Sequence, residues 1–139
     1  MVNYLQSLTP ETFDFLISVL GEEHVSIKDF DLDQHSKDES FHEPHRPAVV
    51  VWPGSAAEIS DILRYANQHR IPVTPWGAGT SLEGNPIPVY GGIVLDTLRC
   101  FERRLDRVIP LRKRRVFQDI QSRHLFVRDL DLGDVGFLG

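Results

Sequence analysis

Apolar residues recur with a helical period in two stretches of the chain. The first begins after Thr9-Pro10, a pair typical of a helix start, and stops at Gly21. Its apolar face consists of Phe13, Leu16, Ile17 and Leu20. The second begins at Ser55, which forms a capping box with Glu58, and must end before Ile71-Pro72. Its apolar face consists of Ile59, Ile62, Leu63 and Ala66. Both stretches are predicted to be amphipathic helices.

Three short apolar runs predict β-strands. Residues 48–52 form a Val-rich run closed by Pro53-Gly54, which is typical of a strand buried on both faces. Residues 73–76 and 93–96 are the other two runs, and each is bounded by proline or glycine. The first two strands and the helix between them form a βαβ unit, for which a right-handed crossover is expected. The predicted fold class is therefore α/β (α+β), with parallel strands and an N-terminal helix. Residues 22–47 are polar and without a period, and are predicted to cross the surface as a loop.

Composition and charge change this picture only near the C-terminus. The 139 residues, 41% hydrophobic and 25% charged, predict one soluble globular domain. The net charge of -5 is uneven, because residues 1–98 carry 14 acidic and 5 basic side chains whereas residues 99–139 carry 10 basic and 6 acidic ones. The basic run 112–115 is typical of a polyanion-binding segment. No aromatic platform or nucleic-acid motif accompanies it, so a solvated charge run is preferred and no nucleic-acid partner is expected.

The number of cysteines, the spacing of histidines and the length of apolar runs exclude several kinds of site. Cys100 is the only cysteine, so the chain can form no intrachain disulfide and no cysteine-based metal site. The pair His42 and His45 is separated by Pro44, which disrupts helical presentation, and no third ligand is nearby, so no metal site is predicted. No apolar run reaches the length of a membrane span, and residues 1–15 lack a signal-peptide pattern. We therefore expect a cytoplasmic protein without a transmembrane segment.

The main chemical motif is a glycine-rich segment at the end of the strand 73–76, which we call the glycine loop: Pro75-Trp76-Gly77-Ala78-Gly79-Thr80-Ser81-Leu82-Glu83-Gly84-Asn85. Glycine permits positive φ and close approach, so backbone N–H groups can gather around an anion, and two hydroxyls add to them. A Rossmann fingerprint would need glycine where Leu82 stands, and a Walker A loop would need lysine after Gly84. Two interpretations remain: a lysine-free cradle for two linked phosphates, or a glycine-rich turn kept for its geometry alone.

Residues 5–106 resemble the FAD-binding domain of the FAD-linked oxidases. The resemblance rests on Arg46-Pro47-Ala48-Val49-Val50-Val51-Trp52-Pro53, on the helix from Ser55, and on Pro72-Val73-Thr74 followed by the glycine loop. Within that superfamily, which includes vanillyl-alcohol oxidase, the chain looks most like the branch of D-lactate dehydrogenase and the glycolate oxidase flavin subunit. The resemblance favours the phosphate cradle and implies an FAD-binding oxidoreductase related to flavoenzymes that oxidise D-lactate, glycolate or similar small 2-hydroxy acids.

In that family the corresponding loop wraps the FAD pyrophosphate with its backbone amides. The resemblance implies that Pro75 sets the exit of the strand and that Gly84 and Asn85 close the loop. It implies pyrophosphate contacts from Trp76, Gly77, Ala78, Gly79, Thr80 and Ser81. Some relatives tether the flavin through a histidine in this loop, and none of the 6 histidines here lies within it, which implies a noncovalent cofactor.

The two parts of the chain are predicted to differ. Residues 1–106 are expected to be the N-terminal part of an FAD-binding domain, and residues 107–139 a basic tail outside the family pattern, disordered or frame-shifted. The family's substrate-holding cap domain and catalytic base have no counterpart here, so no catalytic residue is assigned and the fragment alone is expected to be catalytically incompetent. The alternative is a noncatalytic truncated product, or a polyanion-binding module that acts through the basic segment. Partner subunits, substrate and electron acceptor are not predicted.

Overall fold

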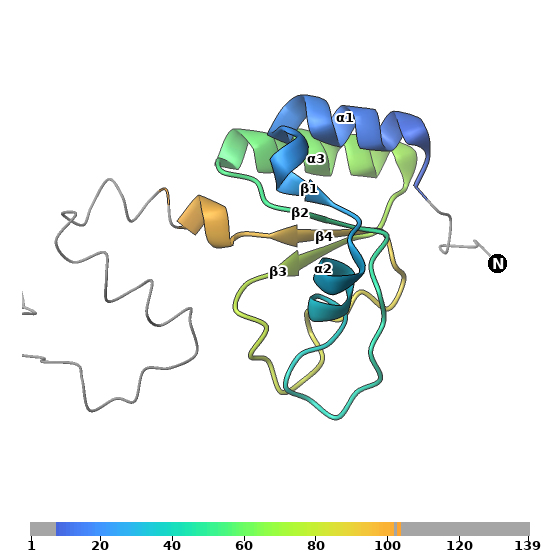
Figure 1. The fold of residues 1–139 in the computed structure, drawn as a ribbon, viewed down its shortest axis with the longest axis vertical. Helices are drawn as coiled ribbons and strands as arrows, with labels where there is room; N and C mark the ends of the chain where they lie inside the picture. The colour runs from blue at the N-terminus through green and yellow to red at the C-terminus, as the bar shows by residue number, and fades with distance from the viewer. Residues whose placement is uncertain (1–7, 102, 104–139) are drawn as a thin grey trace, which may run out of the picture. The chain divides into compact units, whose positions relative to one another are not determined.

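The computed structural model describes residues 8–101 and residue 103, so the predicted tail 107–139 lies outside the described residues. The helices are α1 (Pro10–Leu20), a 3-10 helix η1 (Glu22–His24), α2 (Asp29–Gln34) and α3 (Ala56–His69). The strands are β1 (Val25–Ser26), β2 (Val49–Val51), β3 (Val73–Trp76) and β4 (Ile93–Asp96). Figure 1 shows α1 and α3 on one side of the sheet and α2 on the other. Within this part of the chain, no helix has the length and apolar character of a membrane span.

The four strands form one sheet in the order β1-β2-β4-β3. Val50 of β2 and Thr74 of β3 both align with Val94 of β4, and both pairings are parallel, whereas β1 runs antiparallel to β2. The α/β fold class is thus confirmed. The last strand lies between the two strands of the predicted βαβ unit, so this unit is split rather than contiguous. All three parallel strands end at the same edge of the sheet, where open α/β sheets bind their ligands.

One face of the sheet is covered by α1 and α3. Leu16 and Leu20 of α1 and Ile62 and Ala66 of α3 pack with Val49, Val51, Ile93 and Leu95 of the sheet. The face of α1 differs from the predicted one, because Thr12 is buried while Ile17 is 39% exposed. The hydroxyl of Thr12 lies 3.4 Å from that of Tyr65, and Phe15 stacks on the same ring. Because of these contacts with α3, α1 buries a different face from the one that its apolar residues alone predict.

The predicted bounds of α3 are confirmed by its terminal contacts. The hydroxyl of Ser55 accepts a hydrogen bond from the N–H of Glu58 at 3.3 Å. The Glu58 carboxylate reaches back to the N–H of Gly54 at 2.6 Å, one residue earlier than in a standard capping box. At the other end Arg70 takes the left-handed conformation, with φ 54°, so the helix stops before Ile71-Pro72.

The prediction of a surface loop for residues 22–47 was wrong. This stretch contains η1, β1 and α2, and it buries Ser26, His35 and Ser36. Its elements are two to six residues long, which is too short for either hydrophobic period to show in the sequence. The stretch covers the second face of the sheet, where Leu32 packs against Val50, Trp76 and Val94.

Candidate functional site

The glycine loop leaves the sheet at the carboxyl end of β3. The carbonyls of Pro72 and Trp76 accept hydrogen bonds from Ile93 and Thr97, at 2.9 and 3.0 Å, so these carbonyls face β4. Backbone groups alternate along a strand, and the nitrogen of Pro75 therefore faces away from β4, where its missing N–H costs no ladder bond. The strand can thus carry proline one residue before its end, and the role implied for Pro75 at the strand exit stays a prediction.

Two glycines of the loop, Gly77 and Gly79, differ in backbone conformation and in the space around them. Gly79 has a φ of 68°, and a Cβ there would lie 2.6 Å from Cζ2 of Trp76, so the loop folds back over the buried indole. At Gly77 a Cβ would meet no atom within 4 Å, and its φ is not positive. The fold itself therefore requires glycine at position 79 but not at position 77. Open space beside the backbone of Gly77 is what close approach of a ligand needs.

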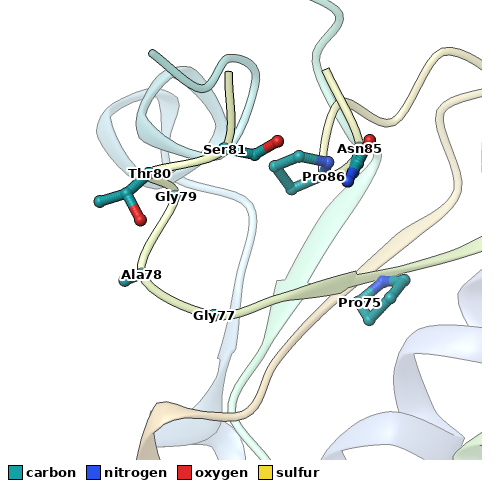
Figure 2. Close-up of a pocket in the computed structure, with 8 residues that line it drawn as sticks. All are labelled: Pro75, Gly77, Ala78, Gly79, Thr80, Ser81, Asn85 and Pro86. Carbon is teal, nitrogen blue, oxygen red and sulfur yellow. The ribbon is translucent and has the colours of Figure 1, made fainter. Parts of the chain in front are cut away.

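The loop lines an open cavity of about 260 Å³ (Figure 2). Figure 2 shows the chain curving around it, with Gly77 and Ala78 on one side and Ser81, Asn85 and Pro86 on the other. The residues that line it are Pro75, Gly77, Ala78, Gly79, Thr80, Ser81, Asn85 and Pro86. Of these, Pro86 was not predicted from the sequence. Trp76 and Gly84 were predicted but lie outside the lining, Trp76 as a core side chain that is 7% exposed.

The backbone N–H groups of residues 77–81 are available for hydrogen bonding. Among the residues that the structure describes, none of these groups has a protein acceptor. No carboxylate from residues 8–101 or residue 103 lines the cavity, and the Glu83 side chain is exposed outside it. Successive unbonded N–H groups around a concave surface are the donor set that binds anions. The arrangement therefore fits a phosphate ligand, and its donors belong mainly to the backbone.

The far side of the loop is held by residues 38–42, which we call the support segment. The Asp38 carboxylate accepts hydrogen bonds from the N–H groups of Gly84, at 2.8 Å, and Ser40, at 3.0 Å. The N–H of Glu39 donates to the carbonyl of Ser81 at 3.1 Å. Partial desolvation raises the pKa of the Asp38 carboxyl, but hydrogen bonds from Ser40, Gly84 and Ser81 outweigh it and hold this pKa below its usual value.

A buried polar cluster lies beneath the support segment. Oδ2 of Asp96 lies 3.1 Å from Nε2 of His35 and accepts a hydrogen bond from Nε1 of Trp52 at 3.0 Å. The His35 ring also lies against the Trp76 ring, with centroids 4.8 Å apart. These side chains do not line the cavity, so they act as structure beneath the loop. Sequence reasoning missed the cluster, although a carboxylate closing an otherwise apolar strand, as in Ile93-Val94-Leu95-Asp96, is a signal that could have indicated a buried partner.

Comparison with known proteins agrees with this geometry. The sequence model of a family described as FAD binding domain matches residues 47–113. A probable mitochondrial D-lactate dehydrogenase of Danio rerio is 38% identical over 95 residues, which cover 68% of this chain and 18% of that protein. Glycolate oxidase subunit GlcD of Bacillus subtilis is 34% identical over 88 residues, which cover 63% of this chain and 19% of that protein. The chain thus spans about a fifth of the length of these curated relatives.

Solved structures share the fold. An alkyldihydroxyacetonephosphate synthase aligns with a TM-score of 0.62 at 19% identity, over 66% of this chain and 21% of that one. A p-cresol methylhydroxylase aligns with a TM-score of 0.56 at 22% identity, over 67% of this chain and 20% of that one. The fold, the family match and the relatives agree with one another. Residues 47–113 thus match the FAD binding domain family, and the chain is similar to relatives named D-lactate dehydrogenase and glycolate oxidase subunit.

Proposed function

We propose that this chain binds FAD, with the FAD pyrophosphate held in the cavity of the glycine loop. The observation that carries the proposal is that residues 77–81 line the cavity and that their N–H groups have no protein acceptor among the described residues. The hydroxyl of Thr80 adds a further donor, whereas the hydroxyl of Ser81 donates to Asp38 and accepts from the N–H of Glu83. Figure 2 shows the Ser81 hydroxyl pointing toward Pro86, whereas the Thr80 side chain points to the other side of the loop. Trp76 and Gly84 contribute indirectly. The loop folds back over the Trp76 indole at Gly79, and the N–H of Gly84 donates to Asp38.

The proposed binding is noncovalent. A covalent flavin needs a nucleophilic side chain at the cofactor, and within the described part of the chain no histidine, cysteine or tyrosine lines the cavity. Acid precipitation of the FAD-loaded chain should therefore leave all the flavin in the supernatant. Yellow colour that stays with the precipitated protein would contradict noncovalent binding.

The relatives place the domain among FAD-binding oxidoreductases, and we propose that the larger protein to which this domain belongs oxidises D-lactate, glycolate or a similar 2-hydroxy acid. Bound FAD supplies hydride acceptance in such reactions. The residues of this chain bind and orient the diphosphate, and none of them is assigned a part in the transfer itself. The chain alone is accordingly proposed to bind FAD without turning over a hydroxy acid.

Titration of the chain with FAD, followed by flavin fluorescence, tests the proposal. Gly77→Asp adds a carboxylate beside the loop backbone, at a position where a Cβ meets no atom within 4 Å, and this charge repels phosphate. Ser60→Asp adds the same charge on the exposed side of α3 and serves as the control. We expect the wild-type chain and Ser60→Asp to change the flavin signal with equal affinity, and Gly77→Asp to bind at least about tenfold more weakly. Equal affinity of all three chains, or no binding by the wild-type chain, would overturn the proposed site.

A further inference from the structure

We propose that Asp38 is a positioning residue for the glycine loop: its carboxylate fixes the far side of the loop so that the N–H groups of residues 77–81 face the cavity. The proposal deepens the FAD-binding function and rests on it. Asp38 lies 46 positions before Gly84 in the sequence, and no pattern in the sequence connects the two.

The contacts of Asp38 use both carboxylate oxygens. Oδ2 accepts from the N–H of Gly84 at 2.8 Å, and Oδ1 accepts from the N–H of Ser40 at 3.0 Å. The next residue, Glu39, donates its own N–H to the carbonyl of Ser81 at 3.1 Å. The support segment therefore holds the loop at two points, Ser81 and Gly84, on the far side of the cavity-lining amides. Hydrogen bonds to a charged acceptor are about twice as strong as neutral ones, which suits a contact that must hold a glycine-rich chain.

The support segment is itself attached to the sheet. His35, three residues before Asp38, is 4% exposed, and its ring contacts Asp96 at the carboxyl end of β4. The carbonyl of Ser36 accepts a hydrogen bond from the N–H of His45 at 2.9 Å, which joins the chain on the two sides of the support segment. The loop is thus joined to the sheet at both ends, through Trp76 and Thr97 on one side and through Asp38 on the other.

A carboxylate beside an anion-binding loop can also act in the opposite way, by competing with the phosphates for N–H groups. The geometry favours positioning, because Asp38 does not line the cavity and the N–H that it accepts belongs to Gly84, which also lies outside the lining. The two roles predict opposite effects of removing the charge. Removing a positioning carboxylate makes FAD bind more weakly, whereas removing a competing carboxylate makes FAD bind more tightly.

Asp38→Asn is the informative variant, because it keeps the size of the side chain but leaves only one acceptor oxygen for two N–H donors. Asp33→Asn is the matched control, since Asp33 belongs to the same region and pairs with Arg46 without touching the loop. We expect Asp38→Asn to raise the dissociation constant for FAD about tenfold and to shift the ³¹P resonances of bound FAD. Asp33→Asn should change neither quantity.

Amide hydrogen exchange in the chain without FAD gives a second measurement. The peptide that contains residues 77–85 should exchange faster in Asp38→Asn than in wild type, and at the wild-type rate in Asp33→Asn. Tighter FAD binding by Asp38→Asn would overturn the proposal in favour of competition, and equal changes in both variants would reduce Asp38 to a general stabilising role. If wild type binds FAD and Asp38→Asn matches it in affinity and exchange, only this inference fails. If wild type binds no FAD, the proposed function fails. If residues 77–85 of Asp38→Asn then also exchange at the wild-type rate, the inference that Asp38 holds the loop fails as well.

Discussion

Asp96 is the residue at which three parts of the described chain meet. Its Oδ2 contacts His35 and Trp52, and its Oδ1 accepts from the N–H of Leu98 at 2.8 Å. Nδ1 of His35 lies 2.8 Å from the carbonyl of Asp31, which can only accept, so Nδ1 carries a proton. The contact between Nε2 and the Asp96 carboxyl then requires one more proton, carried by the imidazole or by the carboxyl. Asp96 is 5% exposed, so each of these donors compensates for lost hydration.

Trp52→Phe should therefore destabilise the fold through a lost hydrogen bond, to which a smaller ring in the cluster of Val50, Trp76 and Val94 adds a loss of packing. The variant keeps an aromatic ring but removes the Nε1–H donor from a buried carboxylate, with an expected cost of about 1.5–3 kcal/mol in the free energy of unfolding. Urea unfolding followed by circular dichroism measures this as a lower midpoint with an unchanged slope. Phe41→Leu, at a side chain that is 91% exposed, is the control and should leave the midpoint in place. An unchanged midpoint in Trp52→Phe would show that water replaces the indole donor.

The lowered pKa of Asp38 predicts how its contribution depends on pH. Because hydrogen bonds from Ser40, Gly84 and Ser81 keep this pKa below its unfolded value, the folded chain binds the proton less readily than the unfolded chain. The stabilisation is then fully present above the unfolded value of about 3.9 and is lost as the pH falls through the lower folded value. The melting temperature of wild type should exceed that of Asp38→Asn at pH 7, and the gap should close below about pH 4. A gap that stays constant down to pH 3 would exclude ionised Asp38 as its source.

Among the elements, those with strong local signals were predictable from the sequence. The bounds of β3 and β4 match the predicted runs, and α3 begins at its serine cap and ends before Ile71-Pro72. Elements without a period were not predictable: β1 and α2 are too short, and their positions depend on pairing with β2 and on burial of His35. The placement of β4 between β2 and β3 is a long-range choice that no local pattern specifies. The same limit applies to the site, where the loop was evident and its contact with Asp38 was not.

The turn before β4 offers a matched pair of glycine variants. Gly91 and Gly92 both have positive φ, 67° and 71°, so alanine at either position meets backbone strain of about 1–2 kcal/mol. At Gly92 a Cβ would also lie 2.2 Å from the backbone oxygen of Pro72, whereas at Gly91 it would meet nothing within 4 Å. Urea unfolding should show Gly92→Ala to be clearly less stable than Gly91→Ala, because β3 must move to admit the methyl group. Equal urea midpoints for the two variants would mean that β3 can move away from Gly92 at little cost in stability.

At the scale of the whole molecule, the two faces of the sheet have unequal support. The α1 and α3 face holds the larger apolar cluster, whereas the face with Val50, Val94 and Trp76 depends on Leu32, Trp52 and the polar contacts of His35. The glycine loop folds over this second face through the contact of Gly79 with Trp76. A ligand that orders the loop therefore also reinforces the less apolar side of the sheet, and binding and stability should be coupled.

FAD should consequently raise the melting temperature of the chain by a large amount. At a free concentration of 100 times the dissociation constant, binding to the folded state alone contributes about 2.7 kcal/mol. In a domain of this size each kcal/mol moves the midpoint by roughly 4–8 °C, so a shift on the order of 10–20 °C is expected. Without FAD, Gly77→Asp should melt at the same temperature as the wild-type chain, because a Cβ at this position meets no atom within 4 Å. With FAD, the variant should lose most of the shift. Inorganic pyrophosphate should give a smaller shift that is equally sensitive to Gly77→Asp, since it reproduces only the linked phosphates. A full FAD shift retained by Gly77→Asp would place the cofactor elsewhere on the chain.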